Sequence, residues 1–198
     1  MSCLPKKGKA KKWFSIISPK VFGEIEIGKT LASEPENLIG RRLTISAIEV
    51  TNDLRKYYLK LSFRITRVEG ENAYTEFDGS ECTRDYISRM IVRRVRRIDT
   101  VQDVVTKDGV KIRVKCIIVV HKKAKTSITK TIRKKVEELI EEIVKNSTLD
   151  DFVKGLINDE IKKRIVAEIR KIYPIRHFEI RKTEVKRSLG GGKSPEEG

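Results

Sequence analysis

Arginines in the middle of the chain are the side chains whose type and spacing most clearly suggest chemistry. Their intervals would place them on one face of a helix over residues 84–98, at Arg89, Arg93, Arg96 and Arg97. A planar guanidinium binds two phosphate oxygens at once, so such a face suits RNA. A solvated face would usually interleave glutamates, yet no acidic residue lies between Asp85 and Asp99. We therefore expect this face to contact phosphates.

A second basic stretch, residues 122–135, also contains no acidic residue. It starts as a loop that enters a helix, where lysines and hydroxyls suit phosphate oxygens. The lysines expected to contact RNA here are Lys122, Lys123, Lys125 and Lys130. The N-terminal segment and a later arginine pair add further candidates, namely Lys6, Lys7, Lys9, Lys11, Lys12, Trp13, Arg41 and Arg42. Trp13 could stack on a base or serve as a core residue.

Composition points to the same kind of partner. The 198 residues include 44 Lys and Arg against 28 Asp and Glu, a net charge of +16. Such self-repulsion favours a polyanionic partner, above all nucleic acid. The longest apolar run, residues 116–120, is too short to span a membrane, and the lysine-rich N-terminus lacks the apolar stretch of a secretory signal. We expect a cytoplasmic protein without a membrane partner.

Residues that usually carry catalysis or bind metals are few and scattered. The cysteines and histidines are Cys3, Cys82, Cys116, His121 and His177. The cysteines form no Cys-x-x-Cys pair and the histidines have no second ligand nearby, so we interpret the cysteines as reduced thiols. Residues 192–194, Gly-Lys-Ser, resemble the end of a phosphate-binding loop but lack its earlier glycine and its following helix. We expect no catalytic residue, no metal site and no cofactor.

Hydrophobic periodicity predicts an α+β fold. Apolar and β-branched patterns typical of strands occur over 24–30, 43–50, 57–66, 73–77, 110–120 and 175–185. Apolar residues at helical spacing occur over 84–98, 128–144 and 149–173. Thr148 and Asp151 match a capping box at the start of the last stretch, which Gly155 and Asn158 could break in two. We expect an antiparallel sheet or small β-barrel with flanking amphipathic helices.

The chain is expected to have three parts. Residues 1–12 contain lysines but no acidic residue and predict a flexible basic arm. Residues 13–187 would form a single α+β domain with a helical subregion at about 127–173. The glycine-rich residues 188–198 predict a flexible tail.

Several short motifs occur in the order found in one protein family. The first are Lys12-Trp13 with Ser18-Pro19-x-x-Phe22, and Leu38-Ile39-Gly40-Arg41-Arg42 followed by Asn52-Asp53-Leu54. The next is Ile98-Asp99 with Lys107-Asp108-Gly109, leading into Arg113-Val114-Lys115. The last is Ile172-Tyr173-Pro174-Ile175-Arg176 with Glu179-Ile180-Arg181-Lys182-Thr183-Glu184-Val185. The ordered set, over about residues 12–187, resembles the archaeal and eukaryotic small-subunit ribosomal protein family S3Ae, also called eS1. The chain stops soon after Val185, which resembles the archaeal type because eukaryotic members have a longer C-terminal extension.

The resemblance implies a structural constituent of the small ribosomal subunit and not an enzyme. It implies a β-barrel-like sheet with flanking helices, located on the platform near the messenger exit and the 3′ end of the small-subunit rRNA. Its partners would be that rRNA, neighbouring ribosomal proteins and messenger RNA near the exit. Two alternatives stay open. A free single-stranded nucleic-acid-binding protein acting outside the ribosome would need exposed aromatics on a sheet face, and a metal-dependent nuclease would need clustered, buried carboxylates.

Overall fold

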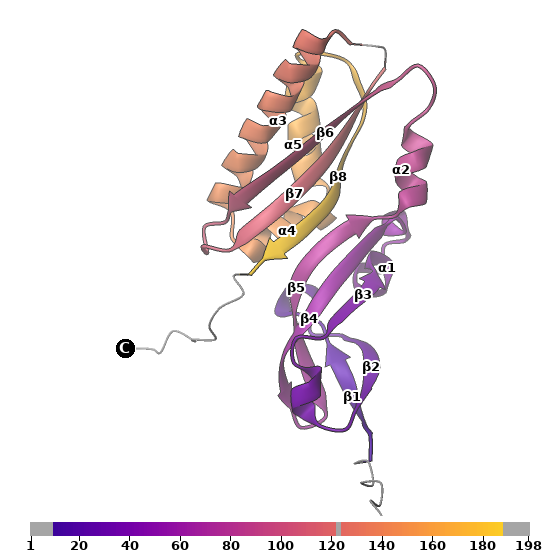
Figure 1. The fold of residues 1–198 in the computed structure, drawn as a ribbon, viewed down its shortest axis with the longest axis vertical. Helices are drawn as coiled ribbons and strands as arrows, with labels where there is room; N and C mark the ends of the chain where they lie inside the picture. The colour runs from indigo at the N-terminus through magenta and orange to yellow at the C-terminus, as the bar shows by residue number, and fades with distance from the viewer. Residues whose placement is uncertain (1–9, 122–123, 188–198) are drawn as a thin grey trace, which may run out of the picture.

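An open β-sheet forms the framework of the molecule (Figure 1). The computed structural model describes residues 10–121 and 124–187. Its strands are β1 (Lys12–Ile17), β2 (Glu26–Ala32), β3 (Arg42–Ser46), β4 (Leu59–Glu69), β5 (Asn72–Cys82), β6 (Arg96–Val105), β7 (Lys111–Val120) and β8 (Ile175–Lys186). Its α-helices are α1 (Ala47–Thr51), α2 (Arg84–Met90), α3 (Thr126–Asn146), α4 (Leu149–Ile157) and α5 (Glu160–Arg170). Short 3-10 segments lie at Lys20–Phe22, Pro35–Leu38 and Leu54–Lys56.

Strand β5 divides the sheet into two halves. β4 pairs with β5 along one edge over its whole length, and β3 pairs with β4. Along the other edge, residues 72–74 of β5 pair in parallel with β1, whereas residues 79–81 pair antiparallel with β8. The resulting order is β2-β1-β5-β8-β7-β6. The α+β class is confirmed, but the sheet is open and mixed, so the small-barrel alternative is wrong.

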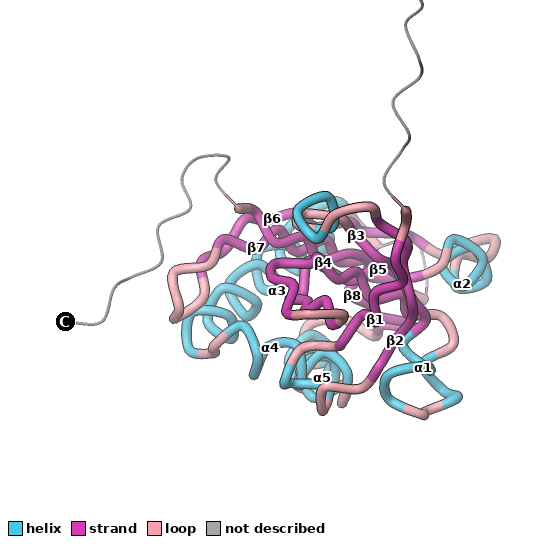
Figure 2. Tube along the Cα trace, turned by 90° about the horizontal axis from the view of Figure 1, so that it is seen from below, coloured by secondary structure: helices cyan, strands magenta, loops and turns pink. Residues whose placement is uncertain are grey.

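The long helices cover only one half of the sheet. α3, α4 and α5 lie against β6, β7 and β8 (Figures 1 and 2). Ile132, Ile140 and Ile165 of these helices are buried in one core with Ile118 and Phe178 of the strands. The half made by β1 to β5 also encloses a smaller cluster that contains Phe14, Ile16, Ala32, Leu38, Ile65 and Ala73. The β6–β8 half of the sheet is therefore packed against the long helices, whereas the β1–β5 half has its own smaller core.

Several elements form where the sequence predicts them. Along β4, every second residue from Leu59 to Ile65 is buried, as its strict alternation indicates. Thr148 accepts a hydrogen bond from the N–H of Asp151 at 3.2 Å and so caps α4. The expected break is confirmed at Asn158, because α4 ends at Ile157 and α5 begins at Glu160, whereas Gly155 lies within α4.

Two expected elements are wrong. The helix expected over residues 84–98 ends at Met90, and Arg96 already begins β6. Apolar residues there fit a helical period, but Ile98 is buried as a strand residue that pairs with Ile118 of β7. Tertiary pairing therefore overrides the local pattern. Residues 47–50, expected to continue a strand from 43, belong to α1 instead.

Some expectations lie outside the described ranges. The tail over 188–198 and most of the arm over 1–12 are not described, so the three-part organisation stays a prediction. Among the described residues, no helix is both long and apolar enough to cross a membrane.

Candidate nucleic-acid interface

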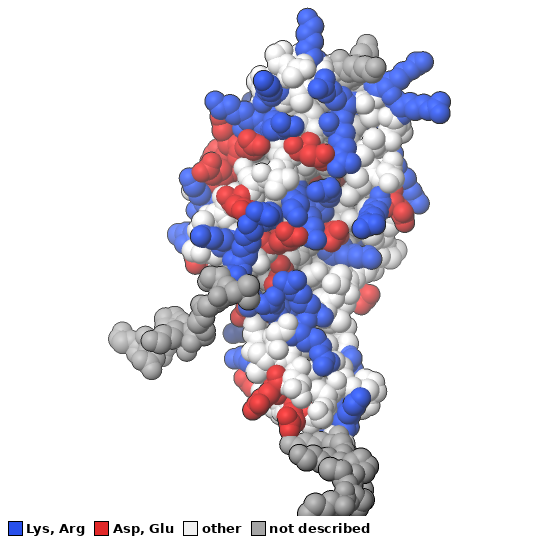
Figure 3. Space-filling model, in the orientation of Figure 1, with Lys and Arg blue, Asp and Glu red and all other residues white. Residues whose placement is uncertain are grey.

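Three chain segments bring basic side chains to one end of the sheet. Arg96 at the start of β6 and Ile175 at the start of β8 both pair with Val120 at the end of β7. Arg97 and His177 both pair with Val119. We call this surface the basic end, and it comprises Arg93, Arg94, Arg96, Arg97, His121, Lys125, Arg176 and His177. Figure 3 shows lysines and arginines gathered there, at the top of the view.

The predicted arginine face does not exist as a helix face. Its members lie on three different elements: Arg89 on α2, Arg93 in the following turn, and Arg96 and Arg97 on β6. Because side chains alternate along a strand, Arg96 and Arg97 point to opposite faces of the sheet. A turn and the start of a strand therefore replace the second half of the expected helix. They still carry three of its four arginines.

The arginines of the basic end differ in their exposure and in their hydrogen bonds within the chain. Arg93 and Arg94 are exposed in the turn before β6, where Arg94 has a φ of 68°. Arg96 is half-buried and its Nη1 donates to the carbonyl of Ala124 at 2.8 Å, which ties β6 to the segment that enters α3. Arg97 is exposed, but its Nε donates to Asp99 at 3.0 Å. Arg93 and Arg94 are thus the best placed for phosphate contacts.

The start of α3 offers phosphates two kinds of hydrogen-bond donor, lysine side chains and backbone N–H groups. Lys125 precedes the first helical residue and is exposed, and Lys130 is exposed one turn further along. The first N–H groups of a helix have no partner within the helix and carry a partial positive charge. An RNA phosphate near Lys125 could therefore accept hydrogen bonds from the backbone and from the lysine.

The surroundings of His177 lower its pKa. Partial burial lowers its pKa first, and the positive charges of Arg176 and His121 lower it further. Lys162 acts in the same direction, whereas Glu179 raises this pKa. The positive character of the basic end near neutral pH therefore comes from arginines and lysines.

The sequence reasoning missed Arg94, His121, Arg176 and His177 as members of this surface. Arg94 follows directly after Arg93, but a continuous helix would turn it away from the face that carries Arg89, Arg93, Arg96 and Arg97. Arg176 and His177 come next to Arg96 and Arg97 only through the register of β7 with β8. One indication of this was present in the sequence, the basic residue Arg176 at the start of the strand expected over 175–185.

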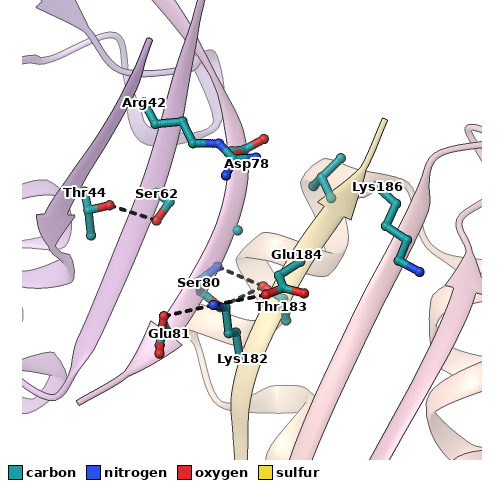
Figure 4. Close-up of a pocket in the computed structure, with 12 residues that line it drawn as sticks. Arg42, Thr44, Ser62, Asp78, Ser80, Glu81, Lys182, Thr183, Glu184 and Lys186 are labelled. Carbon is teal, nitrogen blue, oxygen red and sulfur yellow. Dashed lines mark hydrogen bonds and ion pairs between the residues drawn. The ribbon is translucent and has the colours of Figure 1, made fainter. Parts of the chain in front are cut away.

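The predicted pair Arg41 and Arg42 is occupied by contacts within the chain. The Nη1 of Arg41 donates to Thr30 Oγ1 at 2.6 Å. The Nε of Arg42 lies 2.6 Å from a carboxylate oxygen of Asp78, whose side chain is only 5% exposed. Figure 4 shows Arg42 reaching over the sheet to Asp78 beside a polar pocket of about 360 Å³. Both arginines fasten strands together, and their contact with RNA stays a prediction.

The lysines and tryptophan at the start of the fold lie far from the basic end. Lys12 and Trp13 begin β1, at the opposite end of the elongated molecule (Figure 1). Trp13 is 60% exposed and pairs across the strands with Leu31, so it is not a core residue. Lys11 is exposed beside it. Lys11, Lys12 and Trp13 thus lie on a surface separate from the basic end.

Five predicted contact residues lie outside the described residues. They are Lys6, Lys7, Lys9, Lys122 and Lys123. Their part in RNA binding stays a prediction.

Groups that could support other chemistry are buried or dispersed. Burial raises the pKa of the Cys82 and Cys116 thiols to about 12, and both cysteines are free. Within the described ranges, no three His, Cys, Asp or Glu residues are grouped so that they could hold a metal ion. A thiol with so high a pKa is a poor nucleophile at neutral pH.

Comparison with known proteins identifies the family of the chain. A sequence profile of the Ribosomal S3Ae family matches residues 5–188. The chain belongs to this family. It is 43% identical over 183 residues to the small ribosomal subunit protein eS1 of Methanopyrus kandleri, covering 90% of this chain and 87% of that protein.

Two other S3Ae relatives give the same picture. Small ribosomal subunit protein eS1 of Methanothermobacter thermautotrophicus is 40% identical over 177 residues, covering 89% of this chain and 91% of that protein. The protein of the same name from Saccharolobus islandicus is 39% identical over 179 residues, covering 90% and 86%. The resemblance stated from the sequence motifs is confirmed.

Proposed function

We propose that this S3Ae family protein is a structural constituent of the small ribosomal subunit that binds rRNA and has no catalytic role. The observation that carries the proposal is the match of about nine-tenths of the chain to archaeal proteins named for the small ribosomal subunit. We further propose the platform near the messenger exit as its position, with rRNA and neighbouring ribosomal proteins as its partners and messenger RNA as a further one. Its place in the cell is then the cytoplasm, with the ribosome.

The basic end is the surface that we assign to rRNA. Folded RNA is bound mainly through phosphates and shape, which suits exposed groups that need no base-specific geometry. Arg93 and Arg94, in the turn before β6, and Lys125, before α3, are exposed, and the pairing of β6 with β7 holds these two segments together. They can therefore engage several phosphates at once.

The alternative hypothesis, a free single-stranded nucleic-acid-binding protein, has weaker support. It would use exposed aromatic side chains on a sheet face to stack successive bases. Tyr58 is only 8% exposed, and the guanidinium of Arg67 lies 4.5 Å from the centre of the Tyr74 ring. The exposed rings of Trp13 and Tyr57 lie on different elements, which does not make a continuous stacking surface.

Sedimentation tests the location. A native lysate is separated on a sucrose gradient, and the small-subunit peak is washed at high salt. We expect about one copy of the chain per small subunit to survive the wash. A chain found only at the top of the gradient would overturn the proposed function.

Charge reversal tests the surface. The pair Arg93→Glu with Arg94→Glu, at the two exposed arginines of the turn before β6, should weaken binding of the purified chain to small-subunit rRNA and lower the salt dependence by about two phosphate contacts. The control pair, Arg55→Glu with Lys163→Glu, makes the same charge change at exposed positions elsewhere. Circular dichroism should show both variants folded. Equal losses for the two pairs would mean that only total charge matters and would remove the basic end from the proposal.

A further inference from the structure

Strand β6 ends the sheet on one side, and its outer edge is regular over its whole length. It pairs only with β7, from Arg96 opposite Val120 to Val105 opposite Lys111, and the register has no shift. Residues 96–105 contain no proline and no glycine. Natural edge strands are protected by prolines, bulges or charged side chains, because an unbroken edge is a template for another strand. β6 has charged side chains but no proline and no bulge.

The hydrogen bond that follows β6 shows which backbone groups face outward. Thr106 donates its N–H to the carbonyl of Val110 at 3.0 Å, and this pair continues the register of β6 with β7. Bonded pairs alternate in an antiparallel ladder, so the even-numbered residues of β6 bond to β7. The odd-numbered residues direct their N–H and C=O groups away from the sheet. We call these the β6 edge: Arg97, Asp99, Val101, Asp103 and Val105.

The outward backbone groups of the β6 edge have no partner among the described residues. Their side chains lie on the face opposite α3, because Ile98 and Val104 point into the helical core. Val101 is 53% exposed and Val105 is 42% exposed. The edge thus offers a row of donors and acceptors beside two exposed valines.

The charges along the β6 edge are already neutralised. Asp103 accepts hydrogen bonds from Arg113 at 2.6 and 2.8 Å and from Lys186 at 2.7 Å. Asp99 is paired with Arg97 at 2.9 Å. A strip with little free positive charge is a poor surface for an RNA backbone, which needs unpaired cations. It is a suitable surface for another polypeptide.

We propose that the β6 edge binds an extended segment of a neighbouring protein, which adds to the sheet as a further strand. The main-chain bonds to the odd-numbered residues would give the affinity. Small apolar side chains at alternate positions of the segment would pack on Val101 and Val105. The choice of a ribosomal neighbour rests on the proposed function, since that function supplies the assembly.

A second copy of this chain fits the edge less well. In the two-fold antiparallel register that pairs all five outward residues, Val101 faces its own copy and Asp99 faces Asp103. Like charges directly opposite each other destabilise a strand pair. A foreign segment has no such constraint, so it is the occupant to which the geometry points.

Amide hydrogen exchange tests the proposal without any substitution. In the free chain, the amides of Arg97, Asp99, Val101 and Asp103 should exchange much faster than those of the intervening residues, which bond to β7. In purified small subunits containing the chain, the outward amides should become protected at least tenfold. Fast exchange in the assembled subunit overturns the β6 proposal alone. If the chain does not sediment with the subunit, the proposed function fails and this proposal falls with it.

Cross-linking and a proline substitution identify the occupant. With Val105→p-benzoylphenylalanine, irradiation of assembled subunits should link the chain to one segment of another protein. A link to rRNA or to a second copy of this chain overturns the proposal. Val101→Pro removes an outward N–H but no bond to β7, so it should abolish the link, whereas Val101→Thr keeps the N–H and should preserve it. If Val101→Pro retains the full link, main-chain addition is wrong.

Discussion

At the residue scale, Gly79 lies where β5 meets β8, the strand that begins the other half of the sheet. A Cβ atom at this position would lie 2.3 Å from the carbonyl oxygen of Thr183. Beside it, the N–H of Ser80 donates to Thr183 Oγ1 at 3.0 Å, and the two hydroxyls lie 2.8 Å apart. Only a residue without a side chain lets β5 and β8 meet here.

Gly79→Ala should therefore destabilise the protein by roughly 2–4 kcal/mol, because backbone must shift to relieve the contact. The matched control is Gly28→Ala in β2, where an added Cβ has no atom within 4 Å. That change should stay within about 1 kcal/mol and could stabilise the strand. Urea unfolding of the two variants measures both effects. Equal stability of the two variants would show that β5 and β8 do not need this approach.

Residue types could be predicted from the sequence better than residue partners. The exposed arginine at position 93 was expected to be available for phosphate, and it is exposed. Arg42 was expected to be equally available, yet it holds the buried carboxylate of Asp78. That partner belongs to β5 and reaches Arg42 only because β3, β4 and β5 lie side by side. A single sequence does not contain this register.

At the element scale, the helices that carry their own start and stop signals were predictable. The cap at Thr148 and the break at Asn158 are local, and both occur in the structure. The segment around Arg93 has no such signal, and its apolar residues fit a helical period although the structure makes its end a strand. The choice depends on β7, which is distant in sequence and supplies the pairing partner of β6.

The cap of α4 gives a direct test of a local signal. Thr148 Oγ1 accepts from the N–H of Asp151 at 3.2 Å and donates to its carboxylate at 2.7 Å. Thr148→Ala should lower the free energy of unfolding by about 1 kcal/mol, because an orphan N–H loses its partner. Thr148→Ser keeps the oxygen and should lower it far less. Thermal unfolding followed by circular dichroism compares them, and equal losses would exclude the cap as the cause.

The carboxylate of Asp103 links β6 to β7 and β8 and makes stability depend on pH. Hydrogen bonds from Arg113 and then Lys186 hold its pKa well below the ordinary value of 3.8. A depressed folded-state pKa means that the stabilisation is complete above the unfolded-state pKa and is lost as pH falls toward the folded-state pKa. Asp103→Asn should therefore reduce stability at pH 7, and the difference from the unmodified chain should shrink at about pH 2.5. Urea midpoints at both pH values decide this, and a constant difference would contradict the linkage.

At the scale of the whole molecule, the open sheet was the feature that the sequence could not define. Strand count and alternation are compatible with a barrel, and the motif resemblance favoured one. The structure stays open because β5 pairs with β1 at one end and with β8 at the other. Whether the sheet closes into a barrel depends on this branching, which requires pairing between strands that are far apart in the sequence.

A buried polar group joins the helical half to the rest of the molecule. The carboxylate of Glu179 on β8 is 7% exposed and pairs with Lys162 of α5. It also accepts a hydrogen bond from Tyr86 of α2 at 2.9 Å. Lys56, before β4, pairs similarly with Asp159, before α5. These contacts connect elements of both halves, so we expect the halves to unfold together.

Lys162→Met should break this coupling, because it leaves a buried carboxylate without its cation. Since Lys162 is one-third exposed, we expect a loss of roughly 2–3 kcal/mol, below the 3–5 kcal/mol typical of a fully buried pair. Fluorescence of Trp13 reports the β1 half and far-ultraviolet circular dichroism reports the helices. Their urea curves should coincide in the unmodified chain and separate in the variant. Adding Glu179→Gln should restore much of the loss by removing the unpaired charge, and Lys163→Met should change nothing. If the two probes still coincide in Lys162→Met at an unchanged midpoint, Glu179 does not couple the halves.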